Sequence, residues 1–220
     1  NIRSHWYFTG FDPYTRADIH SLDAVGRRLL CGSDGGLFSS TDGGDTWTDL
    51  SNGLQITQLY RLGCSPTDPS RVIAGAQDNG MNLLDGDDWS HVLGADGMEG
   101  AIDPEDPQIM YGEQQYGGLY RSDDGGQNFF NIAGQIGEQG AWVTPFAIDP
   151  VDPQILVAGY NNIWKSSDRG DNWEPLSAFD TDLTIRALAI APSDNEVIYC
   201  ANTASFFRTT VGGSDWDDLS

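Results

Sequence analysis

A repeat of about 43 residues runs through this chain of 220 residues and limits the folds open to it. Aromatic residues mark the repeat at Trp47, Trp89, Phe129, Trp173 and Trp216, which are 42, 40, 44 and 43 residues apart. A repeat of this length is a supersecondary unit that buries its apolar face against neighbouring copies. The sequence therefore predicts an array of similar structural units.

A second regularity is the segment before each aromatic residue, which we call a box turn. The complete copies share Ser, Asp, Gly and an aromatic residue at fixed offsets: Ser40, Asp42, Gly44 and Trp47; Ser122, Asp124, Gly126 and Phe129; Ser166, Asp168, Gly170 and Trp173. The second copy is shortened to residues 84–89, and the fifth, residues 209–216, lacks the Asp. Glycine permits positive φ, the Ser and Asp side chains bond turn N–H groups, and the ring packs between sheets. We therefore assign the box turns a structural role, with no metal site.

A proline turn precedes each box turn from the second repeat onward. These turns lie at residues 65–69, 103–107, 149–153 and 191–194, and each joins two apolar strand-like segments. Together with the segments on either side of the box turn, each repeat contains four short strands, which is typical of a propeller blade. The predicted fold is an all-β β-propeller of four-stranded antiparallel blades.

The repeats divide the chain into a single predicted propeller domain over residues 1–220. Its blades are expected at residues 18–52, 53–93, 94–135, 136–178 and 179–220, after an N-terminal strand or extension at residues 1–17. Five repeats either close into a five-bladed ring or form an arc of a larger propeller. A small residue stands three positions before the first proline of each turn, as expected for strands crowded around a central axis. These residues are Gly63, Ala101, Ala147 and Ala189.

The three cysteines lie in strand-like segments that carry other apolar residues. Cys31, Cys64 and Cys200 are odd in number, and the sequence contains no CxxC pair. We expect all three to be free, buried thiols that pack as small apolar side chains.

The box turns and proline turns resemble those of Asp-box propellers, known as BNR repeats. The resemblance covers roughly residues 18–220 and extends to sialidase-type, sortilin-type and xyloglucan-degrading propellers of large secreted proteins. It implies that the box turns lie on the face opposite the ligand. Because those propellers have six or more blades, the resemblance leaves two alternatives open: five blades that close on themselves, or a segment of a larger polypeptide or assembly. A sialidase is disfavoured because the arginine cluster that such an enzyme needs is missing.

The resemblance places the ligand face at the loops between second and third strands and between blades. Amides, carboxylates and aromatic rings on one concave face suit a hydroxyl-rich ligand. The predicted ligand-binding residues are Gln77, Asp78, Asn79, Glu113, Gln114, Tyr116, Trp142 and Tyr160. Should the protein be a glycoside hydrolase with a two-carboxylate mechanism, the catalytic candidates are Asp78, Asp96, Glu99 and Glu113. Solvated polar loops without a ligand are the alternative.

The net charge of −22 restricts the partners. A polyanionic nucleic acid or an anionic membrane surface would be repelled, and no apolar run reaches the length of a membrane span. Asp-rich runs at residues 85–88 and 215–218 make Ca²⁺ conceivable, but neither has EF-hand spacing, so no cofactor is predicted.

Three functions remain open. The leading hypothesis is a secreted or cell-surface module that binds a glycan or a protein. A xyloglucanase-like glycoside hydrolase, or a fragment of one, is the first alternative, although the residues favour a protein that is not an enzyme. A structural spacer in a surface assembly is the second.

Overall fold

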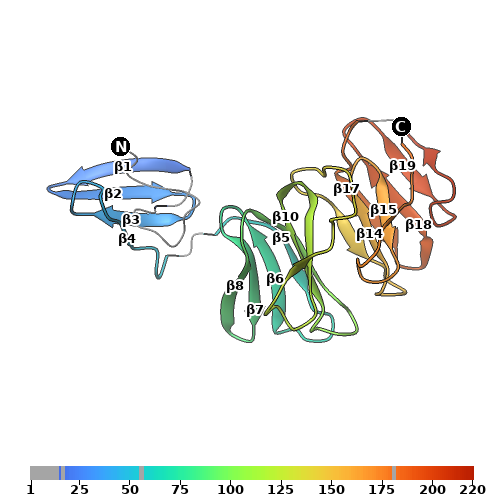
Figure 1. The fold of residues 1–220 in the computed structure, drawn as a ribbon, viewed down its shortest axis with the longest axis horizontal. Coiled ribbons are helices and arrows are strands. Elements are labelled where there is room, and N and C mark those ends of the chain that lie inside the picture. The colour runs from blue at the N-terminus through green and yellow to red at the C-terminus, as the bar shows by residue number, and fades with distance from the viewer. Residues whose placement is uncertain (1–14, 16–17, 55–56, 180–181) are drawn as a thin grey trace. The chain divides into compact units, whose positions relative to one another are not determined.

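The computed structural model of the chain describes residues 15, 18–54, 57–179 and 182–220. These residues form five four-stranded antiparallel sheets, so the fold is all-β and its sheets are propeller blades, as the sequence predicted (Figure 1). In every sheet the strands lie in chain order, each paired with the next through a hairpin. Apart from Thr15, the predicted N-terminal extension lies outside the described residues.

Each sheet falls within one sequence repeat. The first contains β1 (Ile19–Val25), β2 (Arg28–Ser33), β3 (Gly36–Ser40) and β4 (Thr48–Asp49). The second contains β5 (Leu59–Cys64), β6 (Arg71–Ala76), β7 (Gly80–Asp85) and β8 (Asp88–Leu93). The third contains β9 (Gly97–Ile102), β10 (Met110–Gln114), β11 (Gly118–Ser122) and β12 (Phe130–Asn131), with a 3₁₀ turn, η1 (Gln115–Gly117), between its middle strands.

The last two sheets repeat this plan. The fourth contains β13 (Phe146–Ile148), β14 (Leu156–Gly159), β15 (Ile163–Ser166) and β16 (Glu174–Pro175). The fifth contains β17 (Ala187–Ala191), β18 (Asp194–Ala201), β19 (Phe206–Thr209) and β20 (Asp217–Asp218). No helix among the described residues is long and apolar enough to cross a membrane.

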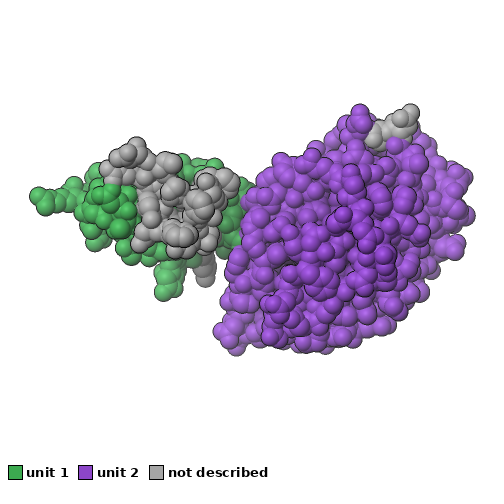
Figure 2. All heavy atoms as spheres, in the orientation of Figure 1, with its two compact units in different colours: residues 1–58, 77–79 green, residues 59–76, 80–220 purple. Residues whose placement is uncertain are grey.

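The chain divides into two compact units, coloured separately in Figure 2. The first unit comprises residues 1–58 and 77–79 and holds the sheet β1–β4. The second comprises residues 59–76 and 80–220 and holds the other four sheets. That all five sheets form a single propeller domain stays a prediction.

Three of the four proline turns are held by the side chain of their first residue, whereas the fourth begins with Ala191. The Asp103 carboxylate accepts the backbone N–H groups of Glu105 and Asp106 at 2.9 and 3.1 Å. Asp149 bonds Val151 and Asp152 in the same way, at 2.8 and 3.1 Å. Both carboxylates are nearly inaccessible to solvent. These backbone donors satisfy one oxygen of each carboxylate. The other oxygen of Asp103 lies 3.2 Å from the Arg169 guanidinium, and the other oxygen of Asp149 accepts the side-chain amide of Asn195 at 3.0 Å.

The three complete box turns share one hydrogen-bond pattern. In the turn after β11, the Ser122 hydroxyl donates to Asp124 at 2.8 Å and accepts the N–H of Gly126 at 2.9 Å. The second oxygen of Asp124 accepts the side-chain amide of Asn128 at 2.7 Å. These bonds favour the ionised carboxylate and lower the pKa of Asp124 to about 2. The carboxylate is therefore occupied within its own turn.

The shortened and the altered copies differ from this pattern. In the second repeat, Asp85 pairs directly with Asp88 across a tight hairpin in which Gly86 has φ +68°. In the fifth repeat, the Thr209 hydroxyl accepts the N–H of Gly213 at 3.0 Å and so replaces the usual serine. The turn of the fifth repeat thus keeps a hydroxyl-to-backbone hydrogen bond although it lacks the Asp.

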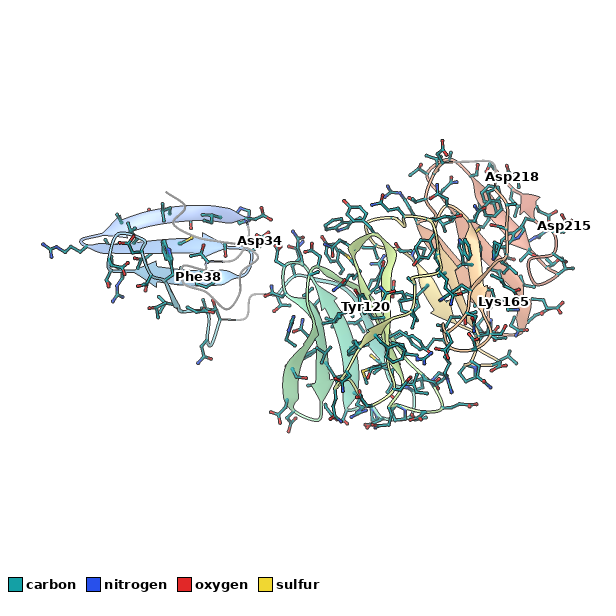
Figure 3. The ribbon with its side chains drawn as sticks, in the orientation of Figure 1. Asp34, Phe38, Tyr120, Lys165, Asp215 and Asp218 are labelled. Atoms are coloured by element: carbon teal, nitrogen blue, oxygen red, sulfur yellow. The ribbon has the colours of Figure 1, made fainter. Side chains whose placement is uncertain are left out.

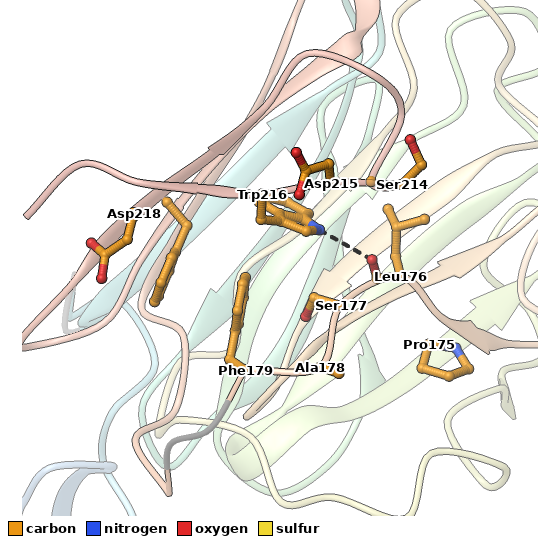
Figure 4. A pocket seen from close by; sticks show the side chains of 11 residues that line it. Pro175, Leu176, Ser177, Ala178, Phe179, Ser214, Asp215, Trp216 and Asp218 are labelled. Atoms are coloured by element: carbon orange, nitrogen blue, oxygen red, sulfur yellow. Dashed lines mark hydrogen bonds between the residues drawn. The ribbon is translucent and has the colours of Figure 1, made fainter.

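The box-turn tryptophans of the fourth and fifth sheets fasten each of these sheets to the one before it. The Trp173 indole donates to the carbonyl of Ile132 at 2.8 Å, just after β12. The Trp216 indole donates to the carbonyl of Leu176 at 3.1 Å, just after β16 (Figure 4). The ring of Phe179 packs edge-on against Trp216, with 5.4 Å between ring centroids.

The core of the second unit lies between successive sheets, whose side chains are drawn as sticks in Figure 3. One cluster includes Ile73, Met81 and Met110 and joins the second and third sheets. A second cluster, which includes Tyr111 and Leu156, joins the third and fourth sheets. A third cluster, which includes Ile198, joins the fourth and fifth sheets.

The cysteines are free, but one of them is not buried. Cys31 and Cys200 have almost no solvent exposure, whereas Cys64 is exposed. The prediction that all three are buried was therefore wrong for Cys64. In the second unit, Cys64 lies on the face of β5 opposite to the one that meets β9, and no sheet of that unit covers it.

Candidate functional site

The loop between β10 and β11 has an unusual backbone conformation. Tyr116, in η1, has φ +63°, a region that residues other than glycine seldom adopt and that is enriched at functional sites. Two backbone bonds hold it: its N–H donates to the carbonyl of Trp142 at 3.3 Å, and its carbonyl accepts the N–H of Gly140 at 3.1 Å. The segment before β13 therefore fixes a loop of the preceding sheet.

Three aromatic side chains from three sequence repeats meet at this point, and we call Tyr60, Tyr116 and Trp142 the aromatic cluster. The rings of Tyr116 and Trp142 lie edge to face, with centroids 5.2 Å apart. The Trp142 indole donates to the Tyr60 hydroxyl at 3.1 Å. Tyr116 and Trp142 remain 48% and 37% exposed, so these large rings are held in place and yet face solvent. Such rings offer flat apolar surfaces for stacking.

Glu113 connects the elements beneath the aromatic cluster. Its side chain is buried, with one carboxylate oxygen accepting the N–H of Thr144 at 2.7 Å and the other accepting the N–H of Glu99 at 3.1 Å. Burial raises the pKa of Glu113 to about 8, although both hydrogen bonds act in the opposite direction. Because Thr144 follows Trp142 by two residues, Glu113 anchors the segment that carries the indole.

Glu99 and Arg61 form a partly exposed pair on adjacent inner strands. The Arg61 guanidinium and the Glu99 carboxylate are 3.6 Å apart, with side-chain exposures of 60% and 25%. Burial raises the pKa of Glu99, and the charge of Arg61 opposes that rise. Arg61 is adjacent in sequence to Tyr60, so charged donors and acceptors lie near the aromatic cluster.

Other predicted residues of the second unit have supporting contacts. The buried Tyr160 hydroxyl donates to the carbonyl of Gly117 at 2.7 Å, and burial raises its pKa. The Gln114 side-chain amide donates to the carbonyl of Gly94 at 3.2 Å, and the N–H of Asp96 bonds the side chain of Gln115. These contacts join the loop that carries Tyr116 to residues 94–96 and to Tyr160.

Gln77, Asp78 and Asn79 belong to the first unit. The Asn79 amide donates to the carbonyl of Gln77 at 3.1 Å, and Asp78 has φ +57°. Carboxylate oxygens of Asp18, Asp34 and Asp78 lie within 4.8 Å of one another. Exposed acidic groups commonly gather without a metal, so this grouping is given no role.

The Asp-rich runs considered for Ca²⁺ include members that pair with arginines. Asp85 bonds Arg71 at 2.7 Å, and Asp217 bonds Arg208 at 2.6 Å. An arginine partner satisfies the carboxylate that a cation would need. Asp215 and Asp218 line an open pocket of about 550 Å³, whose aromatic residues continue the core between the last two sheets (Figure 4).

Sequence reasoning did not single out Tyr60, Arg61 or Thr144. Neither Tyr60 nor Arg61 belongs to the predicted ligand-binding or catalytic residues. Thr144 acts through its backbone N–H, which no side-chain pattern reveals. The structure thus adds an aromatic and a charged partner to the predicted Glu113, Tyr116 and Trp142.

Comparison with solved structures identifies the fold. The chain is similar to the GH74 xyloglucanase from Xanthomonas campestris, with 17% identity, a TM-score of 0.59, and coverage of 88% of this chain and 36% of that one. It is also similar to an ancestral GH74 enzyme, with 15% identity, a TM-score of 0.60, and coverage of 92% and 31%. The chain therefore spans about a third of the length of these structures. No family model matches, and no curated protein matches.

Proposed function

We propose that this protein is a propeller module that binds a glycan over the aromatic cluster of its second unit. The carrying observation is the pair of exposed rings, Tyr116 and Trp142, which the backbone and the Tyr60 hydroxyl hold in a fixed orientation. Rings fixed before binding stack on a sugar face at little entropic cost. The similarity to xyloglucan-degrading propellers concerns the fold and leaves the ligand to be found.

The polar groups near the rings support a hydroxyl-rich ligand. Arg61 and Glu99 are partly exposed and supply donors and acceptors, and the pair at 3.6 Å is loose enough to exchange its contact for ligand hydroxyls. A net charge of −22 favours a neutral polysaccharide over an acidic one. Such a ligand is met outside the cell, which is the location we propose.

Binding to a panel of soluble polysaccharides, including xyloglucan, tests this function by affinity electrophoresis and calorimetry. Trp142→Ala should weaken binding at least about tenfold because it removes one ring and releases the other. Trp89→Ala is the matched control, since Trp89 is 56% exposed and lies outside the aromatic cluster. Equal affinity of Trp142→Ala and the unaltered chain would refute the assignment. Binding of a protein instead of a polysaccharide would favour a protein-binding module, and binding of neither would favour a structural spacer.

A glycoside hydrolase is the second candidate, and the environment of Glu99 favours it. Burial raises the pKa of its carboxyl group, as a general acid requires, and its backbone N–H donates to the second carboxyl group of the pair, that of Glu113. Release of reducing sugar from a bound polysaccharide would show the activity. Glu99→Gln should then abolish release and retain binding, whereas a loss of binding alone would count against catalysis.

A further inference from the structure

The junction between the third and fourth sheets is more polar than the junctions before and after it. On the second strand of each sheet, one residue lies opposite a small inner-strand residue and faces the next sheet: Ile73 in the second sheet, Tyr111 in the third and Val157 in the fourth. All three side chains are at most 1% exposed. Of the three, only Tyr111 brings a hydroxyl group into the core.

The box turn of the fourth sheet carries an exceptional residue at the same junction. Arg169 has φ +61°, a conformation that residues other than glycine seldom adopt and that is concentrated at functional sites. Its guanidinium lies 3.2 Å from the buried carboxylate of Asp103, in the proline turn of the third sheet. The corresponding residues of the neighbouring junctions include a glycine in place of the arginine: Ser65 with Gly125, and Asp149 with Gly212.

Buried polar atoms near Arg169 lack hydrogen bonds. Among the residues that the structure describes, the hydroxyl of Tyr111, the Nε of Arg169 and one oxygen of Asp103 have no hydrogen-bond partner. Arg169 reaches that oxygen as an ion pair, without the geometry of a hydrogen bond. Buried polar groups without a hydrogen bond are costly and rare. The three atoms, two of them donors, therefore call for a ligand that completes their bonds.

An open pocket of about 350 Å³ lies at this end of the junction. Arg121 and Arg169 both line it, and Tyr111 pairs directly with Arg121 across β10 and β11, so their side chains share a face. Burial and then the charge of Asp103 raise the pKa of Tyr111, whereas the charges of Arg121 and Arg169 lower it. Its hydroxyl therefore lies near the groups of the pocket. Both sheets have a neighbour on either side within the second unit, so the pocket is not at an end of that unit.

The chemistry of the pocket restricts the ligand. The Nε of Arg169 can only donate, so it does not suit a metal ion and requires an acceptor. Three carboxylates line the pocket beside two guanidiniums, and the chain has a net charge of −22, so an anion is repelled. A neutral hydroxyl group meets both conditions. It can accept from Arg169 and donate to the free oxygen of Asp103, and Tyr111 can bond an adjacent hydroxyl.

We propose that the pocket between the third and fourth sheets is a second binding site, which takes a neutral polyol or a single sugar unit. Its volume lies near the lower end of the range of about 300–1,000 Å³ for small-molecule sites. The site is separate from the aromatic cluster, because the loop of Tyr116 precedes β11 and the box turn after Ser122 follows it. The proposal therefore does not depend on a glycan at the aromatic cluster.

Titrating the full chain with D-glucose, D-xylose and xylitol tests the proposal by calorimetry and saturation-transfer NMR. At least one of these probes should bind. Tyr111→Phe removes a single oxygen and should weaken that binding at least about tenfold, because one hydrogen bond to the probe is lost. Without the probe, the variant should be at least as stable in urea as the unaltered chain, since the lost hydroxyl has no partner. Tyr120→Phe, on the opposite face of β11, is the matched control and should bind normally.

A second variant tests the charged pair. Asp103→Ser combined with Arg169→Gly introduces the residues of the preceding junction, so the double variant should fold, as circular dichroism checks, and should lose the binding. Trp142→Ala should retain it, because Trp142 belongs to the aromatic cluster. Failure of all three probes to bind would overturn the proposal. So would unchanged binding by Tyr111→Phe or by the double variant, a loss of stability in Tyr111→Phe, or a binding that Trp142→Ala abolishes.

Discussion

Replacing Glu113 by Gln provides a quantitative test of the buried carboxylate beneath the aromatic cluster. Burial raises the pKa of Glu113 from 4.5 to about 8, so the folded chain holds this proton more tightly than the unfolded chain does. The resulting stability is fully present below pH 4.5 and is lost as the pH rises through about 8. At about 1.36 kcal/mol for each pH unit in that window, the loss is about 5 kcal/mol.

Glutamine removes this pH dependence at the expense of a hydrogen bond. Its one carbonyl oxygen accepts the N–H of Thr144 or of Glu99, but not both, and the orphaned donor costs about 1–3 kcal/mol. The variant should therefore be about 1 kcal/mol less stable than the unaltered chain at pH 5. At pH 9 it should be about 2–4 kcal/mol more stable, because ionised Glu113 is then absent.

Urea unfolding at pH 5, 7 and 9, followed by tryptophan fluorescence, measures the difference. Hydrogen exchange at the amides of Thr144 and Glu99 supplies a local readout, since one of the two should exchange faster in the variant at pH 5. Glu105→Gln, the same substitution at an exposed residue, is the matched control. A stability difference for Glu113→Gln that stays constant from pH 5 to 9, or that turns further against the variant as the pH rises, would refute the reasoning.

Two further predictions concern packing and exposure. Gly170→Ala should destabilise the second unit by about 1–3 kcal/mol in thermal or urea unfolding, since Gly170 has φ +94° and a Cβ there would lie 2.5 Å from the core. Gly137→Ala, where a Cβ meets nothing within 4 Å, should be nearly neutral, and equal effects would contradict the packing argument. In dilute protein, a thiol reagent should modify Cys64 at once and Cys31 and Cys200 only after unfolding; simultaneous reaction of all three would contradict the observed burial.

The architecture was predictable from the sequence because its signals are local. A proline turn such as the one begun by Asp103, and a box turn such as the one built on Ser122, Asp124 and Gly126, bond mainly within a few residues. Turns of this kind are encoded in short segments, so a single sequence reveals both their position and their spacing. Five four-stranded sheets followed from that spacing.

The candidate site was less predictable because its contacts join distant repeats. Tyr60 and Trp142 meet across 82 positions, and the partner of Glu113 at Thr144 is a backbone group. The loop composition predicted Glu113, Tyr116 and Trp142 as site residues. It did not predict that the side chain of Glu113 is buried whereas those of Tyr116 and Trp142 are exposed. The same limit explains Cys64: its apolar segment predicts a strand but does not tell which sheet face a neighbour covers.

The indole bonds of Trp173 and Trp216 give the second unit a direction. Each reaches back to the residue just past an outer strand of only two residues, β12 or β16. So short a strand makes too few ladder bonds to hold its own edge, so it depends on the sheet that follows it. A force applied to the C-terminus should accordingly strip the unit one sheet at a time, each departure loosening the outer edge of the sheet behind it.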